Sequence, residues 1–203
     1  MPEVGVIHLV RHGQASFGAA DYDVLSADGE EQARLVGVAL VGLAPDRVVH
    51  GSLVRQRRTA SIAAAAAGWE SVPTVDRRWD EISSVPLPLL TGSLEEAQRD
   101  YEADLERWIA GEPGDGESFV EFVARAEAAV AALGDGTSVV VTSGGPIAAV
   151  AAGLLGGAPG TFARLMRVLA NASVTKVVSG RRGLSLLTFN EHTHLLPDRV
   201  TYR

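Results

Sequence analysis

The sequence predicts an α/β fold of three layers, with a mostly parallel central sheet between helices and an antiparallel hairpin at one edge. Short apolar runs of strand length alternate along the chain with longer segments of helical periodicity. Two strand-like segments near the C-terminus, residues 173–179 and 184–189, are joined by a short stretch that begins and ends with glycine. No linker or repeat divides the 203 residues, so residues 1–203 are expected to form one domain.

Four segments predict the parallel strands of the sheet. Residues 4–10 form an apolar run of strand length, and residues 138–142 contain consecutive valines. Residues 47–50 and the extended stretch 74–79 complete the set. Parallel neighbours need crossover connections, which we expect to be right-handed.

Helices are predicted between these strands. Residues 28–43 have apolar positions at roughly helical spacing, with Ser26 or Asp28 as N-cap. Ser118 and Glu121 have the spacing of a capping box at the start of a helix over 118–133. Residues 83–88 are interrupted by prolines and are expected to form a loop. The remaining predicted helices span 53–67, 94–109 and 147–155.

Composition excludes several classes of function. The net charge of −7 argues against nucleic acid as the main partner. The apolar stretch 60–68 is far too short to span a membrane, and the first residues lack a signal-peptide pattern. There is no cysteine, so disulfides and thiolate metal sites are excluded. We therefore expect a cytoplasmic protein that binds neither membrane nor nucleic acid.

Polar residues stand at three points where a predicted strand gives way to a loop or helix. They lie in residues 11–13, 51–55 and 142–146. If the strands are parallel neighbours, all three junctions meet at one edge of the sheet, where ligands bind in folds of this class. Helix N-termini there offer free N–H groups and a partial positive charge, which suit a phosphate.

The side chains at these junctions match the needs of a phosphomonoester. Arg11 and Arg55 supply bidentate donors, and neutral His12 supplies a nucleophilic nitrogen. Gln14 adds a neutral donor beside His12, and Glu81 is the best-placed carboxylic acid for protonating the leaving oxygen. The alternatives are that Arg11 caps a strand with His12 in a turn, and that Glu81 is a solvated loop acid.

Taken together, these segments resemble the histidine phosphatase superfamily, which includes cofactor-dependent phosphoglycerate mutases and many small phosphatases. The resemblance covers nearly the whole chain. It implies a phosphoglycerate mutase-like fold, and a mechanism in which His12 becomes phosphohistidine, Arg11 and Arg55 hold the phosphoryl oxygens, and Glu81 is the acid. The segments that carry it are LVRHGQASFG at 9–18, LSADGEEQA at 25–33, GSLVRQRRTA at 51–60, RWDEI at 78–82, VVVTSGGPIAAV at 139–150, NASVT at 171–175 and FNEHTHL at 189–195.

Two positions depart from the family pattern: Ala15, where many members have threonine, and, more seriously, Ser143. Ser143 stands where the family normally has a second histidine that helps to bind the transferred phosphoryl group. Loss of one charge-assisted hydrogen bond costs about 1.5–3 kcal/mol, which slows an enzyme without silencing it. The Ser143 hydroxyl and the N–H groups of Gly144 and Gly145 are expected to replace part of that contact.

The sequence therefore predicts a phosphomonoester hydrolase acting through His12 on a small phosphorylated metabolite, with activity reduced by Ser143. Two alternatives stay open: a phosphate-binding regulatory protein, and phosphoryl transfer of the phosphoglycerate mutase type. No cofactor is expected, and no metal, because no set of side chains has ligand spacing. His8, His192 and His194 are assigned structural roles. A homodimer is left open, since the sequence shows no interface.

Overall fold

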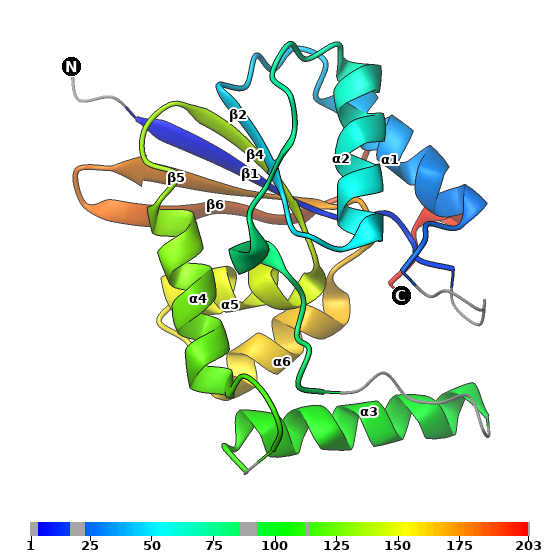
Figure 1. Cartoon of the computed structure of the whole chain (residues 1–203), viewed down its shortest axis with the longest axis vertical. Helices are drawn as coiled ribbons and strands as arrows, with labels where there is room; N and C mark the ends of the chain where they lie inside the picture. The colour runs from blue at the N-terminus through cyan, green and yellow to red at the C-terminus, as the bar shows by residue number, and fades with distance from the viewer. Residues whose placement is uncertain (1–3, 17–22, 86–92, 113, 203) are drawn as a thin grey trace.

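The computed structural model describes residues 4–16, 23–85, 93–112 and 114–202 (Figure 1). Within these residues one sheet of six strands has the order β3-β2-β4-β1-β5-β6. The first four strands pair in parallel, β5 runs antiparallel to β1, and β6 runs antiparallel to β5. The predicted mostly parallel sheet with an antiparallel edge is therefore confirmed. The strands are β1 (Gly5–Arg11), β2 (Arg47–His50), β3 (Thr74–Val75), β4 (Thr137–Thr142), β5 (Val174–Gly180) and β6 (Gly183–Glu191).

Helices cover both faces of the sheet, which gives the three predicted layers (Figure 1). On one face, α1 (Ala27–Ala39) and α2 (Val54–Ala67) pack on alternate residues of β1 and β4. On the other face lie α4 (Phe119–Ala131), α5 (Gly144–Leu154) and α6 (Pro159–Val168). Burial on both sides explains why the central strands read as continuous apolar runs.

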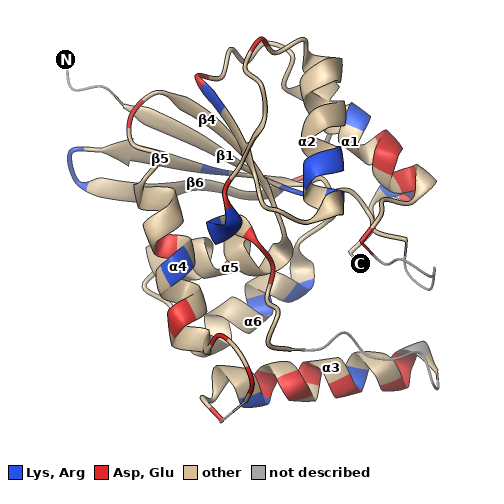
Figure 2. Cartoon of the chain, viewed as in Figure 1, with Lys and Arg blue, Asp and Glu red and all other residues tan. Residues whose placement is uncertain are grey.

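Helix α3 (Leu94–Ile109) lies outside these layers, across the ends of α4 and α6 (Figure 1). Trp108 near its C-terminus packs edge to face on Phe119 and Phe122, with ring centroids 5.3 and 5.4 Å apart. The rest of the helix carries many of the acidic residues of the chain (Figure 2). This aromatic contact, together with the buried Leu105, attaches an amphipathic, largely acidic helix to the domain.

The register of the central strands places the predicted junctions side by side. Arg11 at the end of β1 is level with Thr142 at the end of β4, and His50 at the end of β2 is level with Val141. Two backbone hydrogen bonds continue the alignment beyond the strands, from His12 N to Thr142 O at 2.8 Å and from Gly51 N to Val141 O at 3.2 Å. The three junctions therefore share one sheet edge.

The local sequence signals hold at several helix starts. Ser26, rather than Asp28, caps α1 by accepting a hydrogen bond from Gly29 N at 3.0 Å. Ser118 and Glu121 form the predicted capping box of α4. Both signals depend on residues within one helical turn of each other, so they are readable without knowledge of the fold.

Other expectations about the elements were wrong. The extended stretch over 74–79 stops after the short β3, and a 3₁₀ turn over Arg77–Trp79 (η1) follows because Asp76 accepts a hydrogen bond from Arg78 N. The sequence analysis missed α6, whose proline and glycine at the start mask its helical pattern. The loop predicted over 83–88, by contrast, is confirmed for residues 83–85, which form no helix or strand, and residues 86–88 lie outside the described residues.

Within the described residues, no helix is both long enough and apolar enough to cross a membrane. A second 3₁₀ turn, η2 (Pro197–Arg199), follows β6. The C-terminal segment around it runs beside the start of α1, where Gln32 Nε2 donates to Arg199 O at 2.8 Å and to Thr201 Oγ1 at 2.9 Å. The end of the chain is thereby brought to the sheet edge that carries the junctions.

Candidate active site

His12 lies buried directly after β1, with 3% of its surface exposed. Its Nδ1 is 2.7 Å from the carbonyl oxygen of Gly13, which can only accept a hydrogen bond, so Nδ1 carries the proton. Its Nε2 is 3.1 Å from Nε of Arg55, which can only donate. Nε2 is therefore an unprotonated nitrogen with its lone pair directed at a guanidinium.

The surroundings of His12 keep the ring neutral. Burial lowers the pKa of His12 well below its usual value, and the charges of Arg55 and Arg11 lower it further. A neutral imidazole is the nucleophilic form. The backbone on either side of the ring is also fixed, because Thr59 Oγ1 accepts a hydrogen bond from Gly13 N at 3.1 Å and Asn171 Nδ2 donates to His12 O at 3.3 Å.

Arg55, in the first turn of α2, is held by a residue that the sequence analysis missed. Its Nη1 is 2.7 Å from Oδ1 of Asp23, and the other oxygen of Asp23 accepts a hydrogen bond from Val54 N at 2.8 Å. Asp23 thus caps α2, whose own N-cap Leu53 makes no side-chain cap. No local pattern links two residues so far apart along the chain.

Arg11 enters the same region from the end of β1. Its Nη1 donates to the backbone oxygens of Leu169 and Tyr202, the latter at 3.2 Å, so the C-terminal segment fixes the guanidinium. A Cβ atom placed on Gly144 would lie 3.7 Å from Arg11 Nε. Arg11 therefore faces the N-terminus of α5, at ordinary van der Waals distance from where a side chain at residue 144 would begin.

Glu81 reaches the same helix N-terminus from the loop after η1. Its two carboxylate oxygens lie 3.1 and 3.3 Å from Gly145 N, and one also accepts a hydrogen bond from Ile82 N at 3.0 Å. A Cβ atom on Gly145 would overlap the carboxylate. Glycine at this position is what allows the acid to approach the helix.

Arg55 and Glu81 open onto a common cavity of about 510 Å³. Arg125 crosses one wall, where it pairs with Glu117 at 2.7 Å and donates to Asp80 O at 3.1 Å. The cavity therefore combines apolar contact surface with several charges, and His12 is not among its lining residues. Its lining residues are Leu53, Arg55, Arg77, Asp80, Glu81, Ile82, Ser83, Val85, Glu117 and Arg125.

The remaining predicted site residues lie around this core. Gln14 is next to the junction, but its side-chain oxygen accepts a hydrogen bond from Ser26 Oγ at 2.8 Å, so its amide turns toward α1. Ser143 is fully buried at the N-cap of α5, and its Oγ accepts a hydrogen bond from Gln56 Nε2 at 2.8 Å. Gly144 is the first residue of α5.

The three histidines expected to have structural roles lie beside backbone carbonyls or within the sheet. His8 lies within β1 opposite Lys176, and its pKa is lowered by burial and by the Lys176 charge. His192 Nδ1 and His194 Nε2 lie 2.6 and 3.0 Å from the backbone oxygens of Asn190 and Ala172. In the part of the chain that the structure describes, no group of three histidine, aspartate or glutamate side chains could hold a metal ion.

The fold and the site define an α/β protein with a buried neutral histidine beside two arginines at the carboxyl ends of its parallel strands. The family model of the histidine phosphatase superfamily (branch 1) matches residues 7–192, and the chain belongs to this family.

Comparison with curated proteins finds a probable phosphoglycerate mutase, GpmB, from Citrobacter koseri. It is 31% identical over 182 residues, which cover 84% of this chain and 83% of the relative. A probable phosphoglycerate mutase GpmB from Salmonella arizonae is 30% identical over the same shares of both chains.

Two solved structures illustrate the likeness in fold. A phosphoserine phosphatase mutant from Entamoeba histolytica, in complex with phosphoserine, has a TM-score of 0.74 at 22% identity and covers 95% of this chain and 100% of its own. A mycobacterial glucosyl-3-phosphoglycerate phosphatase has a TM-score of 0.70 at 27% identity, over 93% of this chain and 100% of its own.

Proposed function

We propose that this protein hydrolyses small phosphomonoesters through a covalent phosphohistidine intermediate on His12. The observation that carries the proposal is the state of the ring: Nδ1 donates to Gly13 O at 2.7 Å, and Nε2 accepts from Arg55 at 3.1 Å. A nucleophile needs its lone pair directed at the position of the electrophile, with a cation beside it for the charge that arrives.

In the first step, Nε2 of His12 attacks phosphorus, and the bond between phosphorus and the ester oxygen breaks. The hydrogen bond that Arg55 Nε–H donates to the lone pair of Nε2 shifts to a phosphoryl oxygen, and Arg55 keeps its proton. Arg11 neutralises the charge of the phosphoryl group from the other side. The Gly13 carbonyl keeps the Nδ1 proton in place and stabilises the ring as it gains positive charge. Glu81 gives its proton to the leaving alkoxide, so an alcohol departs.

In the second step, water attacks phosphorus and the nitrogen–phosphorus bond breaks. Glu81, now a carboxylate, accepts a proton from that water, and inorganic phosphate leaves with His12 neutral again. Glu81 suits both roles because it stands at the cavity that Arg55 also lines. The alcohol leaves through this open cavity and water enters by the same route.

Phosphoryl transfer of the mutase type differs only in the acceptor of the second step. The curated relatives named as probable phosphoglycerate mutases favour it, and it replaces water by a second hydroxyl. The chain between Glu81 and Ser118 is short for a segment that would enclose a substrate, which supports water as the acceptor. Incubation with 3-phosphoglycerate, followed by ³¹P NMR, separates the two outcomes as released phosphate or an isomeric phosphoglycerate.

The proposal is tested with p-nitrophenyl phosphate between pH 5 and 8, using wild type, His12→Ala and His50→Ala. His50 is a matched control because it is also a buried histidine at a strand end, with Nδ1 2.6 Å from the carbonyl of the glycine that follows. We expect His12→Ala to lose turnover and His50→Ala to retain it. Equal release of phosphate by wild type and His12→Ala would show that the protein is not this enzyme, and a phosphate-binding regulatory role would then stand.

A further inference from the structure

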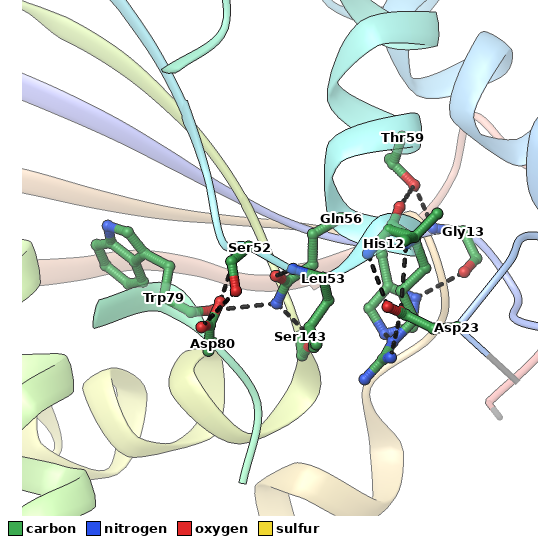
Figure 3. Close-up of polar contacts among 12 residues, drawn as sticks. His12, Gly13, Asp23, Ser52, Leu53, Gln56, Thr59, Trp79, Asp80 and Ser143 are labelled. Carbon is green, nitrogen blue, oxygen red and sulfur yellow. Dashed lines mark hydrogen bonds and ion pairs between the residues drawn. The ribbon is translucent and has the colours of Figure 1, made fainter. Parts of the chain in front are cut away.

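Gln56 is a fully buried residue in the first turn of α2, and its amide orientation is set by the backbone around it. Its Oε1 accepts a hydrogen bond from Leu53 N at 3.2 Å, and its Nε2 donates to Trp79 O at 3.0 Å. Because an N–H can only donate and a carbonyl can only accept, the opposite orientation of the amide is excluded. Nε2 has one further hydrogen, which points to Ser143 Oγ at 2.8 Å (Figure 3).

This contact determines what the Ser143 hydroxyl can do. Its oxygen accepts from Gln56, so its own hydrogen must be donated in another direction. Among the residues that the structure describes, the hydroxyl makes no hydrogen bond to an acceptor. The hydroxyl is fully buried, and a buried donor without an acceptor carries a free-energy cost that a ligand can remove.

Ser143 occupies the N-cap position of α5, but its side chain does not cap the helix. A serine at this position ordinarily accepts a hydrogen bond from the N–H group two or three residues on. In α5 Ser143 makes no such side-chain cap, and Gly145 N donates to the Glu81 carboxylate instead. The Ser143 side chain is thus released from the helix and held by Gln56.

Ser143 lies in the chain between two residues that approach His12 and Arg11. The residue before it, Thr142, accepts the backbone hydrogen bond from His12 N at 2.8 Å. The residue after it, Gly144, faces the Arg11 guanidinium. A phosphoryl group bound between His12 and Arg11 therefore meets the N-terminus of α5 at Ser143.

We propose that Gln56 is a positioning residue that turns the Ser143 hydroxyl hydrogen toward the transferred phosphoryl group. The pair supplies a neutral hydrogen bond to that group, and neither partner titrates between pH 5 and 8. The expected effect of the pair on turnover rests on the proposed function. Its expected effect on the affinity for phosphate does not require turnover.

The test is a double-mutant cycle of wild type, Ser143→Ala, Gln56→Met and the double variant. Two quantities are measured for each protein: kcat/KM for p-nitrophenyl phosphate and the affinity for inorganic phosphate by calorimetry. Ser138→Ala is the matched control, because Ser138 is a buried serine at the far end of β4 whose hydroxyl has no hydrogen-bond partner among the described residues. Thermal unfolding identifies any variant that fails to fold.

We expect Ser143→Ala to weaken both quantities about tenfold or more, the size of one hydrogen bond to a charged group. Gln56→Met should have a comparable effect, and the double variant should be no worse than the more affected single variant. The ratio of wild type to Ser143→Ala should stay constant from pH 5.5 to 8, whereas a titrating partner would change it. Ser138→Ala should match wild type.

Two results would overturn the inference. One is a Ser143→Ala variant with wild-type phosphate affinity. The other is a double variant whose loss equals the product of the losses in Ser143→Ala and Gln56→Met. Such independence would mean that Gln56 acts through Trp79 or through general stability. If Gln56→Met does not fold, Gln56→Leu takes its place in the cycle. Turnover that persists in His12→Ala contradicts the proposed function alone, because the affinity cycle does not depend on turnover.

Discussion

Arg55 donates a hydrogen bond from Nε to Nε2 of His12 at 3.1 Å, so the cation proposed to bind the phosphoryl group already contacts the nitrogen proposed to attack it. Both side chains are buried, at 7% and 3% exposure. The contact keeps the nitrogen unprotonated, and the guanidinium covers it in this structure. In the proposed mechanism the phosphoryl group displaces the guanidinium from Nε2, so that attack and charge neutralisation are coupled in one movement of Arg55.

Asp23 is expected to control how Arg55 makes that movement. In Asp23→Asn the amide can still cap α2, but the ion pair at 2.7 Å loses its charge. We predict a fall in kcat of about tenfold because Arg55 is less well placed. KM should stay level or decrease, since a negative charge near the phosphate is removed.

Asp28→Asn is the control for this variant, because Asp28 forms an exposed ion pair with Arg199 at 2.9 Å. Steady-state kinetics with p-nitrophenyl phosphate checks both. Wild-type kinetics in Asp23→Asn would mean that the ion pair only caps the helix.

Glu81→Gln should reduce kcat to an extent that depends on the leaving group of the substrate. Without the acid, an alkyl phosphate such as glycerol 2-phosphate should react 10²–10⁴-fold more slowly, the usual contribution of general acid catalysis. p-Nitrophenyl phosphate should lose much less, because nitrophenolate leaves without a proton. The comparison of kcat for the two substrates in one variant is its own control, and equal losses would remove Glu81 from the role of acid.

His12 should make the protein less stable in mild acid. Its pKa is lowered in the folded state, so between that value and about 6.5 the unfolded chain binds a proton that the folded chain does not. The free energy of unfolding therefore rises with pH through this window, and it falls as the pH drops below about 6.5. His8 and His194, whose pKa values are also lowered, act in the same direction.

Urea unfolding of wild type and His12→Gln at pH 7.5 and 5.5 measures this effect. Wild type should lose about 1 kcal/mol more than the variant over that interval, since one fully expressed proton is worth about 1.4 kcal/mol per pH unit. An identical pH dependence in the two proteins would mean that His12 is not held neutral by the fold.

The sequence predicts the fold and the family well because the signals involved are local or periodic. The consecutive valines of β4 and the capping box at Ser118 are readable within one element. The sequence also predicts that residues after different strands share one site, because parallel strands have their carboxyl ends at the same edge of the sheet. His12 and Arg55 meet in this way.

Contacts between distant segments were beyond the sequence. Nothing near Asp23 indicates that it holds Arg55, and nothing near Gln56 indicates that its amide reaches both Trp79 and Ser143. For Gln14 the sequence places the residue near His12, but it does not reveal the hydrogen bond from Ser26 that turns the Gln14 side chain toward α1. Side-chain direction depends on tertiary neighbours that a single sequence does not display.

The central claim is that His12 carries the phosphoryl group, and rapid-quench labelling with a ³²P-labelled phosphomonoester tests it most directly. Wild type should form a labelled protein whose label is stable in alkali and released in acid, in step with a burst of alcohol, and the label should map to the peptide containing His12. His12→Ala should remain unlabelled while His50→Ala labels normally. Turnover by wild type with no labelled protein, or equal labelling of His12→Ala, would contradict the account.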